Sequence, residues 1–207
     1  MPWDEAQAFV VTMLDSAIAK KPDAICLAAL STDSVTDQLN KCIASKVPVI
    51  GFDSGVPGAP EGSIYANAST DNTAAGALAA TSMYPAIQAM VKADGIADVA
   101  VVGHDMYKND VAEKSAANGI LDASDEGAKL GAIIAVGFDS GIRQKTAVRA
   151  GYFLGSITQD PYNIGYQAVE LAYKAVMGEA VANVDTGTKF YTAANIDDAS
   201  IKDLVYD

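Results

Sequence analysis

Residues 48–56 read Pro-Val-Ile-Gly-Phe-Asp-Ser-Gly-Val, and residues 134–142 read Ile-Ala-Val-Gly-Phe-Asp-Ser-Gly-Ile. The pentapeptide Gly-Phe-Asp-Ser-Gly therefore occurs twice, each time at the end of an apolar run that is typical of a buried parallel strand. This repeat predicts two similar lobes. A carboxylate just past the carboxyl end of a parallel strand points into the crevice where open α/β sheets bind ligands. We therefore expect Asp53 and Asp139 to face one polar molecule from opposite sides.

Short apolar runs alternate with amphipathic segments along most of the chain, which predicts an α/β architecture. Residues 24–30 and 47–52 are expected strands separated by a helix, the crossover unit of parallel sheets. An amphipathic helix is expected before Lys20, and residues 197–207 are expected to form a polar tail, with a last turn as an option. Further helices are predicted at 73–90, 111–123, 142–150 and 161–177, and further strands at 63–67, 99–103, 132–137, 153–158 and 188–192.

The composition excludes several classes of protein. Half of the 207 residues are hydrophobic, so the chain can bury a sizeable core. Its 14 basic and 26 acidic side chains give a formal charge of -12, which disfavours nucleic acid and anionic lipid as partners. No apolar run reaches the roughly 20 residues needed to cross a bilayer, and the first residues lack the order of a secretory signal.

The sequence points to no metal, cofactor or catalytic unit. Cys26 lies in an apolar strand run and Cys42 on the apolar side of a helix pattern, so we expect buried free thiols, with a disulfide as the alternative. His104 is the only histidine, and neither it nor Asp105 has the spacing of a metal site or a catalytic triad. The glycines around Asp53 match no phosphate-binding motif.

Several segments in order resemble the type I periplasmic sugar-binding proteins, the ribose-binding family that delivers sugars to ABC transporters. The matching segments are residues 21–25, 47–53, 69–72, 136–139 and 155–161. The resemblance implies two parallel-sheet lobes with a cleft that closes on a monosaccharide. It places residues 1–70 and 160–185 in an N-terminal-type lobe, and residues 71–159 and 186–207 in a C-terminal-type lobe. It also implies an ABC permease as partner and a periplasmic or membrane-anchored extracellular location.

The chain departs from this family in two places. The first strand, helix and strand of the family have no counterpart before residue 1, and a segment of the second lobe is missing between Gly103 and Asn109, so the fold is expected to be shortened. Missing strands would expose sheet edges. A homodimer, or a scaffold that no longer binds sugar, is therefore among the expectations.

Six residues are candidates for binding the ligand. Ionised Asp53 and Asp139 would accept hydrogen bonds from sugar hydroxyls, although each could instead cap the helix after its strand. The resemblance adds the amides of Asn109 and Gln159, whose alternative is loop polarity, and Thr70 at a chain crossing. Phe138 is a candidate for stacking on the sugar, with Phe52 second, although aromatic residues at strand ends more often belong to a core.

These features favour a non-enzymatic protein that binds a monosaccharide between two lobes and delivers it to an ABC-type permease. One alternative is the effector-binding domain of a sugar-responsive transcription regulator, although no helix-turn-helix precedes Phe9. Another is a carbohydrate hydrolase in which Asp53 and Asp139 are the paired carboxylates.

Overall fold

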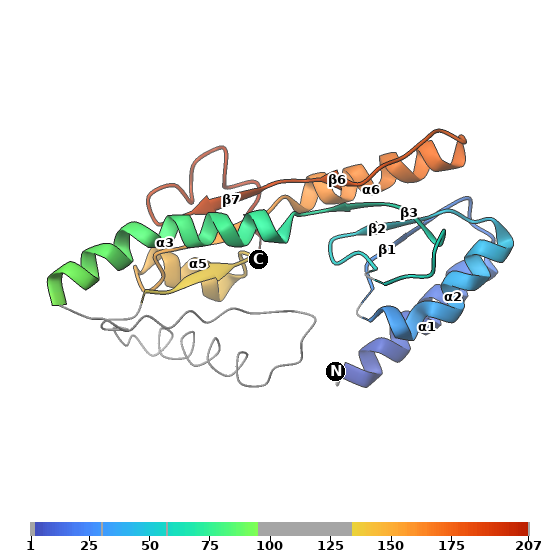
Figure 1. Ribbon diagram of the computed structural model, residues 1–207, viewed down its shortest axis with the longest axis horizontal. Coiled ribbons are helices and arrows are strands. Elements are labelled where there is room, and N and C mark those ends of the chain that lie inside the picture. Colours follow the sequence, from blue (N-terminus) through green and yellow to red (C-terminus); the bar gives the residue numbers. More distant parts are fainter. Residues whose placement is uncertain (1–2, 30, 57, 95–133, 207) are drawn as a thin grey trace. The chain divides into compact units, whose positions relative to one another are not determined.

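The computed structural model describes residues 3–29, 31–56, 58–94 and 134–206 (Figure 1). The chain divides into two compact units. Unit 1 consists of Met1–Thr70 and Asp160–Gly187, and unit 2 of Asp71–Gln159 and Thr188–Asp207. The chain therefore passes from one unit to the other three times. The expected strand at 99–103, the expected helix at 111–123 and His104 lie outside the described residues.

Unit 1 contains a parallel sheet with the strand order β1-β2-β3-β6. The strands are β1 (Ile25–Leu27), β2 (Val49–Phe52), β3 (Ile64–Ser69) and β6 (Val184–Asp185). Strands β1 and β2 lie within the expected strands 24–30 and 47–52, and β3 extends two residues beyond the expected strand 63–67. All three pairings are parallel, as expected. The sequence did not predict β6, because two residues are too few to form a periodic pattern.

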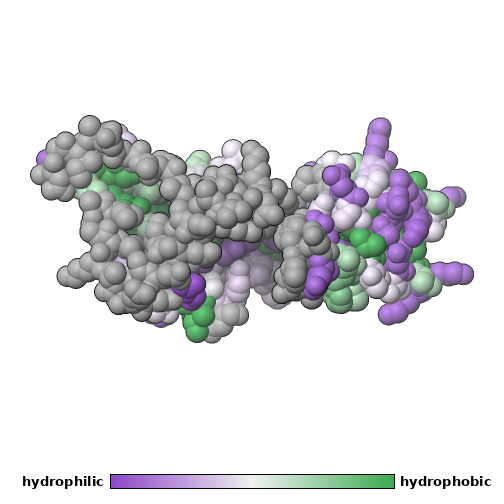
Figure 2. Space-filling model, turned by 90° about the horizontal axis from the view of Figure 1, so that it is seen from below, coloured by the Kyte–Doolittle hydropathy of each residue, from purple (hydrophilic) through white to green (hydrophobic). Residues whose placement is uncertain are grey.

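Helices cover both faces of this sheet (Figure 1). Helices α1 (Trp3–Ala19) and α2 (Thr32–Ser45) bury one face, and α6 (Pro161–Val176) buries the other. Neighbouring residues on β2 separate the two cores, because Val49 packs with α1 and α2 whereas Ile50 packs with α6. On the right of Figure 2, the α1–α2 face of unit 1 shows hydrophilic side chains interspersed with smaller hydrophobic areas, as expected for amphipathic helices.

The two cysteines have different environments. Cys42 is a free, fully buried thiol, as expected. Cys26 is also free, but the prediction that it is buried was wrong, because it is exposed. Ile25 and Leu27 point toward α1 and α2, so Cys26 points to the opposite face of the sheet. There it contacts α6 through a long hydrogen bond of 3.6 Å from Sγ to the Ala168 carbonyl. Among the described strands, β1 lies at the sheet edge, which leaves Cys26 incompletely covered.

Unit 2 has a sheet with the order β4-β5-β7 in its described part. Strands β4 (Val136–Phe138) and β5 (Gly155–Gln159) run parallel, and β7 (Thr188–Tyr191) pairs with β5 in the antiparallel direction. Helix α5 (Ile142–Arg149) connects β4 to β5, and α3 (Asn72–Asp94) contacts β5 and β7. Strand β7 begins directly after the chain passes from unit 1 back to unit 2, and no crossover helix of unit 2 precedes it. Because only parallel pairing needs such a crossover, β7 can pair with β5 in the antiparallel direction.

The prediction of a polar tail at residues 197–207 is only partly correct, because the carboxyl-terminal segment packs onto unit 2. It forms successive turns that bury Ile196 and Ile201 in the core of unit 2. The Thr158 hydroxyl on β5 also donates a hydrogen bond of 3.0 Å to the Leu204 carbonyl. These buried residues are spaced five apart among polar neighbours, which matches neither a helix nor a strand period.

The two units thus confirm the α/β architecture expected from the alternating pattern. Of the helices in the described residues, none combines the length and the apolar character that a bilayer span requires.

Candidate functional site

The repeated pentapeptide has the same backbone feature in both copies. Asp53 has a φ of 52° and Asp139 a φ of 72°, the left-handed region that residues other than glycine, asparagine and aspartate seldom adopt. The preceding glycines are also equivalent: a methyl group on Gly51 would collide with the Asn67 side chain, and one on Gly137 with Gln144 and Ser156. Unusual backbone conformations of this kind concentrate at functional sites.

The loop that carries Asp53 is fastened to both neighbouring strands. The Asp53 amide donates to the Ala68 carbonyl on β3 at 3.1 Å, and the Ser54 hydroxyl donates to the Ala29 carbonyl beyond β1 at 3.2 Å. No helix follows β2, because the chain turns and continues into β3. The helix-capping alternative for Asp53 was therefore wrong.

Buried hydroxyls hold the backbone at Asp139. Its carbonyl accepts hydrogen bonds from Ser156 Oγ at 2.8 Å and from Tyr191 Oη at 3.0 Å, and both donor residues are fully buried. The helix that follows, α5, has Gly141 as its N-cap residue and no side-chain capping bond. Gly141, rather than Asp139, is therefore the N-cap residue of α5.

Tyr191 should make the stability of unit 2 sensitive to alkaline pH. Burial raises the pKa of the Tyr191 phenol and is the largest effect. The hydrogen bond with Ser156 partly offsets it, and Asp139 and Tyr206 add smaller upward contributions. Because the folded state holds this proton more tightly than the unfolded state, the stabilisation is complete below pH about 10, the ordinary phenol pKa, and is lost as pH rises through the folded value.

Tyr191→Phe should therefore reduce the alkaline loss of stability, as measured by urea unfolding between about pH 8 and pH 11. It should also lower the free energy of unfolding at neutral pH by about 1 kcal/mol, because the Asp139 carbonyl loses a donor. Tyr84→Phe, at an exposed position on α3, is the matched control and should keep the wild-type slope. Parallel pH profiles for wild type and Tyr191→Phe would contradict this assignment.

Thr70 and Gln159 occupy equivalent positions in the two sheets. Phe52 pairs with Ala68, so Thr70 lies two residues past the partner of the residue before Asp53. Phe138 pairs with Ile157, so Gln159 lies two residues past the partner of the residue before Asp139. Each unit thus has an aspartate and a second polar residue on adjacent parallel strands at the same edge. The sequence did not reveal this equivalence, since the register of the strands is required to see it.

The chain leaves each unit directly after these residues. Thr70 ends the first segment of unit 1, and Gln159 ends the first segment of unit 2. In both cases the next residue is an aspartate that caps a helix. Asp71 Oδ1 accepts from the Ala74 amide at 2.9 Å, and Asp160 Oδ1 accepts from the Asn163 amide at 2.8 Å.

Thr70 is almost fully buried, and its hydroxyl makes no hydrogen bond within the described residues. The hydroxyl of Thr186, which follows β6, is likewise buried without a partner there. The Thr186 amide bonds the carbonyl of Ser69, so the two threonines lie close together where unit 1 is connected to unit 2. A buried hydroxyl without a partner costs about 1–3 kcal/mol, which makes this a place where water or a ligand group would be favourable.

The aromatic candidates differ in burial. Phe52 packs against the core between the sheet and α6, as the core alternative predicted. Phe138 is 38% exposed at the end of β4, so part of its ring is accessible. Asn109 lies outside the described residues.

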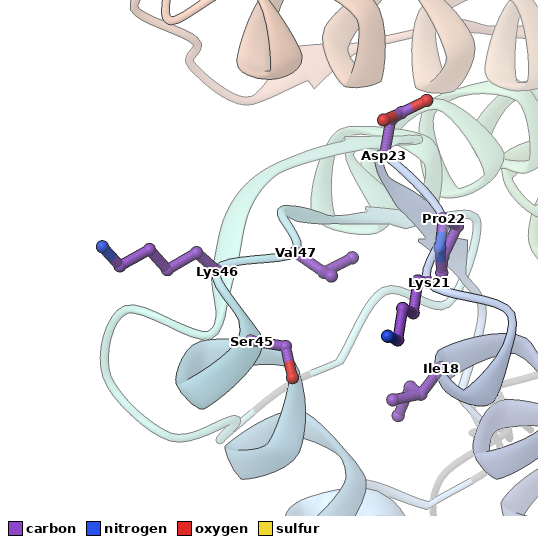
Figure 3. A pocket seen from close by; sticks show the side chains of 7 residues that line it. All are labelled: Ile18, Lys21, Pro22, Asp23, Ser45, Lys46 and Val47. Atoms are coloured by element: carbon purple, nitrogen blue, oxygen red, sulfur yellow. The ribbon is translucent and has the colours of Figure 1, made fainter.

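The pocket shown in Figure 3 lies elsewhere in unit 1. It has a volume of about 450 Å³ and lies where α1 and α2 end and where β1 and β2 begin. Lys21 points between Ile18 and Ser45, whereas Lys46 and Asp23 point outward (Figure 3). Asp53 and Thr70 lie at the carboxyl ends of the strands. The pocket lies at the amino ends of the strands, on the opposite side of unit 1 from these two residues.

Groups of three or more histidine, cysteine or acidic side chains with metal-binding geometry do not occur in the described parts of the chain.

The fold and the positions of these residues define an α/β protein with two units. Each unit has an aspartate and a second polar side chain at the carboxyl ends of its parallel strands.

Comparison with known proteins identifies the family. Residues 5–114 match the periplasmic binding protein domain, and the chain belongs to this family. This confirms the resemblance and the fold class. No curated protein matches the chain.

Solved structures have the same fold over nearly the whole chain. A protein from Brachyspira murdochii, described as an ABC transporter and LacI family transcriptional regulator, is 33% identical with a TM-score of 0.77, covering 95% of this chain and 84% of its own. A carbohydrate transporter solute-binding protein from Agrobacterium radiobacter in complex with D-arabinose is 27% identical, with a TM-score of 0.69 and coverages of 95% and 83%. A solute-binding protein from Agrobacterium vitis with bound D-fucose is 24% identical with a TM-score of 0.75, covering 97% of this chain and 85% of its own. Each relative thus has a part without counterpart in the present chain, as the shortened fold predicted.

Proposed function

We propose that this protein binds a monosaccharide between its two units and delivers it to an ABC-type permease. The observation that carries the proposal is that each unit has an aspartate and a second polar residue at the carboxyl ends of adjacent parallel strands. These residues are Asp53 and Thr70 in unit 1, and Asp139 and Gln159 in unit 2. Membership of the periplasmic binding protein family and the sugar bound to the Agrobacterium radiobacter relative support it. In this proposal unit 1 is the N-terminal-type lobe and unit 2 the C-terminal-type lobe.

The proposed chemistry uses hydrogen bonds of complementary types. Sugar hydroxyls donate to the carboxylates of Asp53 and Asp139, and each ionised carboxylate can accept from two neighbouring hydroxyls. Gln159 and Asn109 offer both a donor and an acceptor, and the accessible ring of Phe138 is suited to the apolar face of a sugar. Thr70 contributes at the connection between the units. Binding alone, without a covalent step, performs this function.

The sugar is proposed to shift the equilibrium between two conformations of the protein. A ligand with contacts on both units favours the conformation in which both sets of contacts are made, by the difference in its affinity for the two states. That conformation would then dock on the permease, with the protein in the periplasm or anchored outside the membrane. The effector-binding domain of a sugar-responsive regulator is the second candidate, favoured by the description of the Brachyspira murdochii relative. Both candidates require the same sugar site.

Sugar binding is tested by thermal unfolding with ribose, galactose, fructose, xylose, glucose and D-arabinose. A ligand that binds only the folded state adds RT ln(1 + [L]/Kd), about 2.7 kcal/mol at a concentration of 100 Kd, and raises the melting temperature by several degrees. We expect a clear shift with one or two of these sugars, and none with mannitol, an open-chain polyol control. The absence of a shift with every sugar at millimolar concentration would refute the proposal in favour of a scaffold.

A further inference from the structure

Each copy of the repeated pentapeptide begins with a glycine that lies beside a polar residue of the next strand. In unit 1, Gly51 on β2 pairs with Asn67 on β3. In unit 2, Gly137 on β4 pairs with Ser156 on β5. Both glycines lie two residues before the aspartate of the pentapeptide, so Asn67 and Ser156 occupy equivalent positions in the two sheets. Their neighbours in the sequence differ, and only the strand register reveals the correspondence.

The Asn67 side chain fills the space above two glycines of the first copy. A methyl group on Gly51 would collide with Asn67 Oδ1, and one on Gly55 would lie 2.9 Å from the same atom. Ala66 and Ala68 pack toward α6, so the Asn67 side chain lies on the other face of the sheet. Asn67 therefore packs against both ends of the first pentapeptide.

The Asn67 amide oxygen is buried and has no hydrogen-bond partner within the described residues. Such an oxygen loses its contacts with water and gains none in the protein, which lowers the stability of the fold. Stability alone therefore does not account for an asparagine at this position. A role in fixing the shape of the neighbouring loop does account for it, because the side chain occupies space that only glycine at residues 51 and 55 leaves open.

Ser156 acts on the second copy through a hydrogen bond. Its hydroxyl is buried and donates to the Asp139 carbonyl at 2.8 Å. Gln144 Nε2 donates to the preceding carbonyl, that of Phe138, at 2.6 Å. A methyl group on Gly137 would collide with Gln144 and would lie 2.8 Å from Ser156 Oγ. The glycine thus makes room for two polar side chains that hold the backbone at and before Asp139.

Asp53 and Asp139 need such contacts because their left-handed backbone is unfavourable by itself. A residue other than glycine keeps this conformation only where the surrounding structure fixes it. A carboxylate that is already fixed in one orientation also loses less conformational entropy when a ligand binds. We propose that Asn67 and Ser156 are positioning residues of the sugar site, each holding the aspartate of its own unit. This inference rests on the proposed function, which assigns the two carboxylates to the sugar.

The affinities of two serine variants test the role of Ser156. The ligand is the sugar that gives the largest shift among the six in the thermal screen. Ser156→Ala should weaken its binding by about three- to tenfold in calorimetric titration, because the Asp139 carbonyl loses one of its two donors. Ser63→Ala is the matched control, since Ser63 is also buried and donates to the Pro60 carbonyl at 2.7 Å, before β3 begins. The control should lose similar stability and keep wild-type affinity.

A double variant separates positioning from a general loss of stability. If Ser156 acts through the Asp139 carboxylate, Ser156→Ala should change the affinity of the Asp139→Asn variant by less than about twofold. It should lower the melting temperature as much in that variant as in the wild type. Wild-type affinity in Ser156→Ala, or an equal loss of affinity in both backgrounds, would overturn the proposal.

Hydrogen exchange of the ligand-free protein tests Asn67 without any sugar. The amides of Asp53 and Gly55 donate to backbone carbonyls at 3.1 and 2.8 Å, so both are protected from exchange. Asn67→Ala should accelerate exchange at these two amides several-fold. Asn195→Ala removes another half-buried asparagine, in unit 2, and should leave them unchanged.

The two experiments distinguish the possible failures. Unchanged exchange at Asp53 and Gly55 in Asn67→Ala would refute its positioning role whether or not a sugar binds. A wild type that binds none of the sugars would refute the proposed function, while the exchange result would still decide whether Asn67 fixes the loop.

Discussion

Replacing Asp53 or Asp139 by asparagine should each weaken monosaccharide binding by about ten- to a hundredfold. A hydrogen bond to a charged group contributes about 1.5–3 kcal/mol, and the substitution removes the charge while preserving the size of the side chain. Both residues have a positive φ, which asparagine tolerates as well as aspartate. The backbone should therefore remain in place, and the loss should be measurable by calorimetric titration with a folded variant.

Two control variants sharpen this experiment. Asp198→Asn changes an equally negative but exposed residue of the carboxyl-terminal turns, and it should bind sugar like the wild type. Asp139→Ala should lose binding and also some stability, because alanine is strained at a φ of 72°. Wild-type affinity in both asparagine variants would remove the two carboxylates from the proposed site and with them the main argument for its location.

Leu39→Ala should lower the free energy of unfolding by about 2–5 kcal/mol, the range for removing a large buried aliphatic side chain. Leu39 on α2 is completely buried between α1, α2 and the sheet, together with Val35 and Val49. Ile43→Ala on the same helix is the matched control: Ile43 is 43% exposed, so its loss should cost under about 1 kcal/mol. Urea unfolding measures both changes. Similar losses for the two variants would contradict the assigned core.

The same variant reports on the independence of the units. The core around Leu39 contains residues of unit 1 alone, and the core around Tyr191 contains residues of unit 2 alone. Hydrogen exchange in Leu39→Ala should therefore accelerate in residues 1–70 and 160–187 more than in unit 2. An equal acceleration in both units would mean that they unfold as a single cooperative body.

The sequence was sufficient for most of the fold because its strongest signals are local. The runs at residues 24–30 and 47–52 are apolar at successive positions, as expected of parallel strands between two layers of helices. Features set by distant contacts were not accessible. The exposure of Cys26 depends on how far α6 reaches across the sheet, and the burial of Ile201 depends on a core formed with Tyr191.

The candidate site was accessible in part for the same reason. The repeated pentapeptide identified Asp53 and Asp139 as equivalent strand-end residues, but nothing in the sequence indicated their left-handed backbone. The donors that hold the Asp139 carbonyl lie 17 and 52 residues away along the chain, in Ser156 and Tyr191. The equivalence of Thr70 and Gln159 likewise follows from strand register, which a linear pattern does not contain.

The return of residues 160–187 to unit 1 has a consequence for biosynthesis. While the ribosome is still translating the segment before Asp160, the growing polypeptide already contains β1, β2 and β3 but lacks α6, so the sheet face with Ile50, Ala66 and Ala68 has no cover. At about 5–20 residues per second, that face stays open for seconds after its strands emerge. Nascent chains of this protein should therefore depend on a chaperone more than their modest size suggests.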